Sequence, residues 1–137
     1  MSLADSAVQR YLATKEVVVL ATVQPDGAPL AMPMWFLHDP ESLTMISVDG
    51  LQKVKNLRRD PRVCVTAESV GANKEIRRVI VQGRAELLSD TPERRALIER
   101  FLAKYHPRLE KLWNGRSMPP NSVMFRIAPS KVRSWGV

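Results

Sequence analysis

The stretch SVDGLQKVKNLRRDPR, residues 47–62, gives the clearest structural signal in the chain. An apolar run ends at Val48, Gly50 permits a turn, and residues 52–59 have the length of two helical turns. Asp60-Pro61 ends this helix because the residue before a proline avoids the helical conformation. The order of residues therefore predicts a strand, a tight turn and one short basic helix.

This helix is a candidate phosphate site. Between Lys53 and Arg62 there are five cations and one anion: Lys53, Lys55, Arg58, Arg59 and Arg62, against Asp60. Lys53 and Asn56 are three residues apart and share a face, whereas Val54 and Leu57 form an inward stripe. Backbone N–H groups at a helix start attract phosphate, and so do lysines. A solvated basic face is the alternative, and the spacing alone leaves both interpretations open.

The flanking sequence predicts a mainly β (α+β) fold. Strands are expected at 17–23, 29–37, 43–48, 62–68, 77–88, 122–127 and 131–135, and helices at 3–13, 52–59 and 92–105. Thr91 is the expected N-cap of the last helix, and Gly83 marks a bulge or a close backbone approach. Repeated βαβ units are missing, so we expect one domain, residues 1–137, built as an antiparallel barrel of six or seven strands with two or three short helices. No structure is assigned to residues 108–121.

Residues 28–37, APLAMPMWFL, lack the polar alternation of a strand with one solvated face. Both faces must therefore be covered, one by the core and the other by a second subunit, a ligand or both. A central strand under helices is the alternative. Pro29 and Pro33 cannot donate ladder hydrogen bonds, which predicts a sheet edge or a bulge.

Composition narrows the class of protein. The formal net charge is +7 and the sequence pI is about 10.1, which favours anionic partners such as nucleic acid or a phosphorylated cofactor. The single cysteine, Cys64, excludes an internal disulfide and is expected to be a small buried hydrophobe in a strand. With no secretory signal in residues 1–13, we expect a cytoplasmic protein.

Few side chains suit unaided catalysis. The sequence has neither GxGxxG nor GxxxxGK[ST], and no close carboxylate pair. His38, His106 and Cys64 are the only strong nitrogen and sulfur ligands, and the two histidines adjoin turn prolines where exposure is expected. We therefore expect no metal site and no Ser-His-Asp triad. Any reactivity should come from a bound cofactor.

Three segments, LATVQPDGAPLAMPMWF (20–36), SVDGLQKVKNLRRDPRV (47–63) and VIVQGRAEL (79–87), resemble the pyridoxamine 5'-phosphate oxidase-like family of flavin and deazaflavin proteins. The chain end VMFRIAPSKVRSWG (123–136) is similar to the closing strands of that family. The likeness is strongest to the branch that uses FMN or the 8-hydroxy-5-deazaflavin coenzyme (coenzyme F-420). It implies a split barrel of the FMN-binding type, a homodimer with cofactor sites between subunits, and a small-molecule substrate.

The resemblance also implies a set of cofactor-binding residues. Those expected beside the ring and ribityl chain are Met32, Pro33, Met34, Trp35, Ser47 and Val48. Lys53 is implied to pair with the phosphate, with Lys55 and Asn56 assisting. Arg78 is implied to lie near the ring, and Arg133 or Trp135 to reach the site of the other subunit. No residue is implied as a catalytic acid or base.

The sequence departs from the family at one strand and at its end. Pyridoxamine phosphate oxidases carry an arginine where this chain has Ala31 and Met32, and a long C-terminal substrate-binding extension that 137 residues cannot hold. These departures argue against true pyridoxamine phosphate oxidase activity, whereas the deazaflavin branch tolerates the simpler pattern; the choice between FMN and deazaflavin stays open.

Three functions remain open from the sequence. The first is an oxidoreductase in which a bound flavin or deazaflavin passes a hydride to a small organic acceptor. The second is a non-catalytic carrier or sensor of flavin, deazaflavin or haem. The third, a nucleic-acid binder, is disfavoured because Trp35 and Phe36 lie in an apolar run rather than among basic residues.

Overall fold

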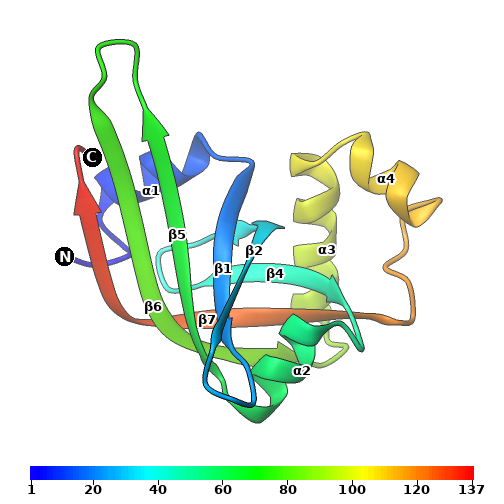
Figure 1. Cartoon of the computed structure of the whole chain (residues 1–137). Coiled ribbons are helices and arrows are strands. Elements are labelled where there is room, and N and C mark those ends of the chain that lie inside the picture. Colours follow the sequence, from blue (N-terminus) through cyan, green and yellow to red (C-terminus); the bar gives the residue numbers. More distant parts are fainter.

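The computed structural model describes residues 1–137 and contains one antiparallel sheet of seven strands, curled into a half-barrel (Figure 1). The strands follow one another across the sheet in the order β2-β1-β5-β6-β7-β4-β3. They are β1 Val17–Val23, β2 Pro29–Trp35, β3 Leu37–His38, β4 Leu43–Val48, β5 Arg62–Val70, β6 Ile76–Leu88 and β7 Ser122–Trp135. The helices are α1 Ser6–Ala13, α2 Gln52–Arg59, α3 Pro92–Lys104 and α4 Arg108–Trp113. The predicted split-barrel architecture is confirmed, with four helices where two or three were expected.

Several local expectations are confirmed. Helix α2 spans the predicted residues 52–59, with Asp60 as its C-cap. The backbone N–H of Arg94 donates to the Thr91 hydroxyl at 3.2 Å, so Thr91 caps α3 as expected, with Pro92 in the first position. None of the four helices is long and apolar enough to cross a membrane.

The closing region differs from the prediction of two strands. It is one strand, β7, with an irregular register: Gln82 lies opposite Lys131 and Gly83 opposite Pro129, so Ser130 is the extra residue. A Cβ atom at Gly83 would collide with the carbonyl oxygen of Ala128. The glycine is therefore needed for a close backbone approach, as its position in the strand predicted.

Residues 28–37 do not form a central strand. Strand β2 lies at one edge of the sheet and pairs only with β1, which confirms the edge position predicted from Pro29 and Pro33. After Phe36 the chain pairs with β4 instead, as the short strand β3 at the opposite edge. The interpretation as a central strand under helices is wrong.

The buried side chains form two clusters on either side of the β4 region. The larger lies inside the half-barrel and includes Val8 and Leu12 of α1 with Leu20, Val65 and Phe125 of the sheet. The smaller joins α3 and α4 to Leu37 and Met124, among others. Figure 1 shows α3 and α4 on the flank of the half-barrel that faces away from the β5–β6 hairpin.

Candidate functional site

The two faces of strand β2 have different surroundings. Met32 and Met34 lie opposite Leu20 and Val18 of β1, whose side chains are buried, so both methionines point into the half-barrel. Met34 is 5% exposed and belongs to the core, and Met32 packs against that core. Pro33 is exposed on the other face.

Trp35, the last residue of β2, is held by a second aromatic ring. It stacks on Tyr105 with 4.4 Å between ring centroids and an interplanar angle of 6°. The buried Tyr105 hydroxyl accepts a hydrogen bond from the N–H of Phe36 at 2.9 Å and donates to the carbonyl of Glu16 at 2.7 Å. Burial raises the pKa of Tyr105 to about 12, so this hydroxyl remains protonated and able to donate.

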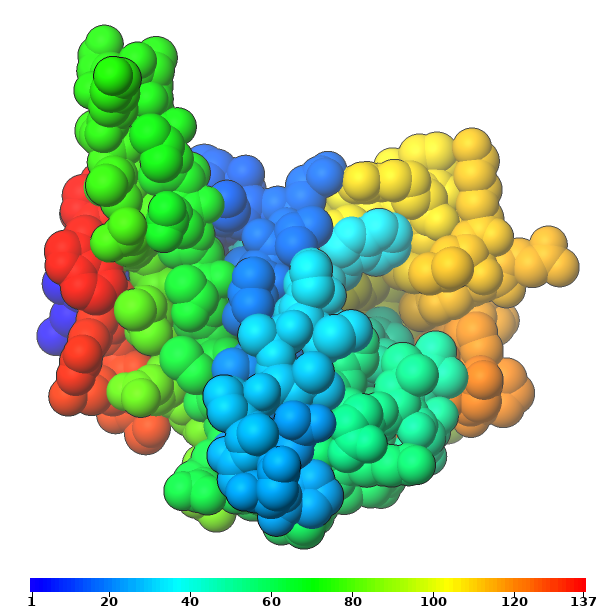
Figure 2. Space-filling view, viewed as in Figure 1, coloured from blue at the N-terminus to red at the C-terminus, as the bar shows by residue number.

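A cavity of about 110 Å³ adjoins Trp35. Figure 2 shows this side of the molecule hollowed between β2 and α4. The lining residues come from β2, the end of β4, α3, α4 and the start of β7: Trp35, Ile46, Ser47, Val48, Phe101, Leu109, Leu112, Trp113 and Ser122. The structure therefore brings three predicted site residues, Trp35, Ser47 and Val48, to one cavity.

Sequence reasoning missed the helical wall of this cavity. Leu109, Leu112 and Trp113 belong to α4, in a segment to which no structure was assigned. Their spacing of three and four residues is the apolar stripe of a helix, and this was the available signal.

The Ser47 hydroxyl is buried and has no hydrogen-bond partner. Most buried polar groups in folded proteins are hydrogen-bonded, so a group without a partner marks a place where a ligand or water completes the structure. Ser47 itself is 8% exposed.

Helix α2 follows β4 and buries two of its polar side chains. Asn56 is 0% exposed; its Nδ2 donates to the Thr22 hydroxyl at 3.0 Å, and its Oδ1 accepts from Gln52 Nε2 at 2.8 Å. Lys53 lies one turn earlier on the same face and is 9% exposed. Desolvation lowers the pKa of Lys53, and its ammonium group makes no hydrogen bond or ion pair within the chain.

The other cations of this segment divide into paired and unpaired groups. Arg58 pairs with Asp49 at 3.1 Å, and Arg59 donates to the carbonyl of Val23. Arg62 pairs with Asp60 at 2.6 Å, which lowers the pKa of that carboxyl to about 2. Lys55 is exposed and, like Lys53, has no acidic partner. Lys53 and Lys55 are the two cations of this segment that make neither a hydrogen bond nor an ion pair, and they are the two lysines that were predicted to bind phosphate.

Arg78 is not brought to this group within the chain. It lies on β6, three strands from β2, and pairs with Glu68 at 2.9 Å. Its neighbour on β7 is Trp135, and Arg133 lies opposite Ile80 in the same pair of strands. These three residues share one face of the sheet, because residues two apart in a strand point the same way.

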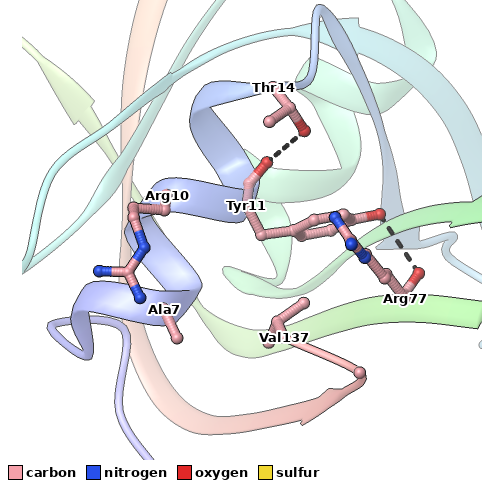
Figure 3. A pocket seen from close by; sticks show the side chains of 7 residues that line it. Ala7, Arg10, Tyr11, Thr14, Arg77 and Val137 are labelled. Atoms are coloured by element: carbon pink, nitrogen blue, oxygen red, sulfur yellow. Dashed lines mark hydrogen bonds between the residues drawn. The ribbon is translucent and has the colours of Figure 1, made fainter.

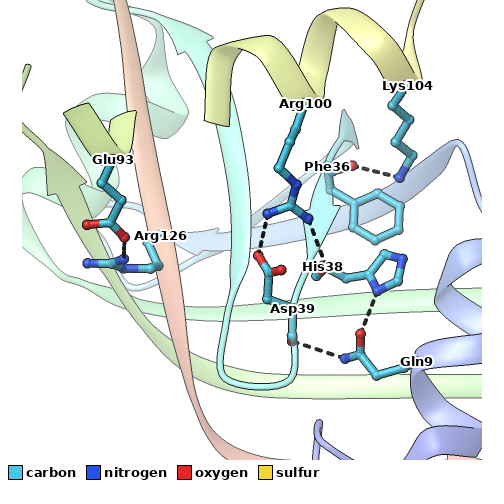
Figure 4. A network of polar contacts seen from close by, with 8 residues as sticks. All are labelled: Gln9, Phe36, His38, Asp39, Glu93, Arg100, Lys104 and Arg126. Atoms are coloured by element: carbon cyan, nitrogen blue, oxygen red, sulfur yellow. Dashed lines mark hydrogen bonds and ion pairs between the residues drawn. The ribbon is translucent and has the colours of Figure 1, made fainter. Parts of the chain in front are cut away.

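The two histidines are used in local polar contacts. His38 is half-buried rather than exposed as expected, and its Nδ1 lies 2.7 Å from Oε1 of Gln9 (Figure 4). Gln9 Nε2 donates to the carbonyls of Leu3 and Asp39, so Gln9 Oε1 is the acceptor and His38 Nδ1 carries the proton. Burial lowers the pKa of His38, helped by the charge of Lys104. His106 is exposed, as expected, and contacts Glu110.

A second, more open hollow of about 320 Å³ lies between α1, the start of β6 and the residues that follow β7 (Figure 3). Tyr11 spans it and donates to the carbonyl of Arg77 at 3.2 Å, which ties α1 to β6. None of the predicted site residues lines this hollow.

The sequence profile of the pyridoxamine 5'-phosphate oxidase family matches residues 4–136. A candidate pyridoxamine 5'-phosphate oxidase from Listeria innocua is 29% identical, with a TM-score of 0.76 over 99% of this chain and 100% of that one. An FAD-binding protein from Mesorhizobium loti is 25% identical, with a TM-score of 0.74 over 92% and 89% of the two chains.

A heme storage protein from Vibrio cholerae has the same fold at 17% identity, with a TM-score of 0.76 over 97% and 94% of the two chains. No curated protein matches the sequence significantly.

Proposed function

Since the chain belongs to the pyridoxamine 5'-phosphate oxidase family, we propose that it is an oxidoreductase that holds FMN or the 8-hydroxy-5-deazaflavin coenzyme. The observation that carries this proposal is the state of Lys53, which is 9% exposed and without a partner on a helix next to the cavity-lining residue Val48. The ammonium group of Lys53 is partly desolvated, which lowers its pKa, and it has no counter-charge; a bound phosphate would supply that charge.

The phosphate end of the site would consist of Lys53, Lys55 and Asn56. Lys53 would donate a charge-assisted hydrogen bond, and the exposed Lys55 would add positive potential at the entrance. Asn56 already uses its amide for Thr22 and Gln52, so its main task would be to fix α2 in position. Helix α2 has no acidic residue in its first turn, which leaves its positive end free for an anion.

The ring end would be formed by β2 and the end of β4. Strand β2 is a sheet edge, so its backbone groups on the side away from β1 are available to a ligand. Met32, Pro33 and Met34 would contribute through this backbone edge, because the side chain of Met34 is in the core. Trp35 and Val48 would exclude water, and the unpartnered Ser47 hydroxyl would meet a polar atom of the ring or ribityl chain.

When bound, a flavin or deazaflavin ring supplies the hydride chemistry. The protein would supply binding, orientation and an apolar surrounding. None of the residues that line the cavity is an acid or a base, so the proton that accompanies the hydride would come from water or the substrate.

A homodimer would complete this site. The outer face of β1 and β2 is apolar and uncovered. On β1, Val17 is 41% and Val19 is 40% exposed. Ala31 and Pro33 are exposed beside them on β2. Contiguous apolar surface of this kind marks an interaction site, and a second copy presents the same surface. Arg78, Arg133 and Trp135 lie on the sheet face that carries this surface, and would approach the site of the other subunit.

A non-catalytic carrier is the second candidate, supported by the absence of an acid or base from the cavity wall. For haem as cargo, the same wall offers no histidine, and His38 Nδ1 is engaged by Gln9. The fold shared with the heme storage protein keeps haem among the ligands to be titrated.

Turnover separates the enzyme from the carrier. The cofactor-free protein would be loaded with FMN or the deazaflavin coenzyme, and the cofactor reduced chemically under anaerobic conditions. Stopped-flow addition of quinone or nitroaromatic acceptors should reoxidise it faster in the protein than free in solution. Equal reoxidation rates in the protein and free in solution would support the carrier. If haem gives a Soret band on binding and no flavin binds, haem would be the ligand.

A further inference from the structure

The cavity beside Trp35 has a second wall that the proposed cofactor site does not use. This wall consists of Phe101 on α3, Leu109, Leu112 and Trp113 on α4, and Ser122 at the start of β7. Seven of the nine residues lining the cavity are hydrophobic, and none is charged. A ligand group buried here would have to be uncharged, because an ionised group would lose its hydration without gaining a partner.

The size of the cavity limits what can enter it. Its volume is about 110 Å³. An engineered apolar cavity of about 150 Å³ is known to hold benzene, so one ring or a group of similar size is the upper limit here. Leu112 lines the cavity and is 73% exposed, so the wall reaches solvent and a larger molecule could extend outwards over it.

The wall around the cavity is firmly held. Phe101, Leu109 and Tyr105 belong to the buried cluster that joins α3 and α4 to the sheet. Trp35, which stacks on Tyr105, forms the side shared with the proposed cofactor cleft, together with Ser47 and Val48. A ring in the cavity would therefore lie next to the proposed cofactor.

We propose that this cavity binds the uncharged, single-ring end of the substrate, with the rest of the molecule lying over Leu112. That the bound molecule is a substrate rests on the proposed function, whereas binding of the ring itself does not. The proposal excludes substrates whose buried end is a carboxylate or a phosphate.

The test uses the cofactor-free protein and ¹⁹F NMR, with fluorobenzene as the probe and 4-fluorobenzoate as its charged counterpart. Ser122→Phe fills the cavity from a position outside the proposed cofactor site, and its hydroxyl makes no hydrogen bond within the chain. Ser117→Phe is the matched control, because it makes the same substitution at an exposed serine that does not line the cavity. Trp113→Ala, which removes part of the wall, is the second variant should Ser122→Phe fail to fold by circular dichroism.

The expected result is saturable binding of fluorobenzene to the unmodified protein and to Ser117→Phe, its loss in Ser122→Phe, and weaker binding to Trp113→Ala. No saturable binding, an equal affinity for 4-fluorobenzoate, or binding unaffected in both cavity variants would overturn the proposal. Parallel titrations with FMN and the deazaflavin coenzyme separate the two claims. Binding of either cofactor without binding of fluorobenzene would refute only the ring pocket. Binding of fluorobenzene without binding of either cofactor would refute only the proposed function.

Discussion

Asn56 on α2 donates a hydrogen bond of 3.0 Å from Nδ2 to the hydroxyl of Thr22 on β1, and both side chains are at most 1% exposed. This contact fixes the basic helix to the barrel, with Lys53 one turn away. The helix therefore presents its lysines from a defined position rather than as a mobile surface element.

Replacement of Asn56 with Ala should lower the free energy of unfolding by about 1 to 3 kcal/mol, because the Thr22 hydroxyl would remain buried without its partner. Urea denaturation at fixed protein concentration measures the change. Thr22→Val removes the other partner, and a double-mutant cycle should give a favourable coupling between the two sites. Additive effects of the two substitutions would show that the bond does not hold α2.

The helix α2 was predictable because its boundaries depend on neighbouring residues. Gly50 has a positive φ of 89°, and Asp60-Pro61 ends the helix. The near-complete burial of Lys53 and Asn56 was not predictable. It depends on packing against β1, whose Thr22 is 34 residues away in the sequence.

The least predictable part of the candidate site is α4. Its six residues are too few for a strong periodic signal, and its apolar stripe gains meaning only when Trp35 and Phe101 are placed beside it. Two closing strands were expected, at 122–127 and 131–135, where the structure has the single strand β7. The residues between the two expected strands include Pro129, which lies opposite Gly83 at an irregular register. The opposing glycine lies 46 residues earlier, so local sequence could not show the continuity.

Tyr105→Phe should destabilise the protein by about 1 to 3 kcal/mol, because the buried N–H of Phe36 would lose its acceptor. The ring stack on Trp35 would remain, so the effect isolates the hydroxyl. Tyr11→Phe, which removes a hydroxyl bonded at a part-buried position, is the matched control and should cost less. A larger loss of stability in Tyr11→Phe than in Tyr105→Phe would contradict the role assigned to the Tyr105 hydroxyl in holding the backbone next to Trp35.

The pH dependence of stability should contain a contribution from Lys104. Burial lowers its pKa to about 8, from 10.5 for an unperturbed lysine. The unfolded chain therefore binds more protons between these values, and this group makes the free energy of unfolding rise with pH from about 8 upwards. Above about pH 10 the raised pKa of Tyr105 acts in the opposite sense.

Lys104→Met should remove that rise, and the difference between the two stability curves from pH 7.5 to 10 isolates it. Lys104 also donates to the Phe36 carbonyl at 2.7 Å and lies 3.8 Å above the Phe36 ring, contacts that favour the charged form. If the stability curves of the two proteins are parallel, these contacts offset the lowering of the Lys104 pKa by burial.

Val19→Arg should convert the proposed dimer to a monomer, because Val19 is 40% exposed and the substitution places a charge in the exposed apolar face of β1 and β2. Light scattering after size-exclusion chromatography at micromolar concentration gives the mass directly. Ser117→Arg adds the same charge at an exposed position elsewhere and should leave the dimer intact. A monomeric mass for the unmodified protein would refute a site completed by two subunits.

The most direct test of the central claim is a fluorescence titration of the cofactor-free protein with FMN, the deazaflavin coenzyme and riboflavin, which is FMN without its phosphate. At least one phosphorylated ligand should bind, and Lys53→Met should weaken its binding about 10-fold to 100-fold, since a hydrogen bond to a charged group contributes about 1.5 to 3 kcal/mol. Riboflavin should bind the two proteins equally, and Lys111→Met, on the exposed face of α4, should change neither affinity. Binding of neither phosphorylated ligand, or equal phosphorylated-ligand affinity in Lys53→Met, would contradict the account.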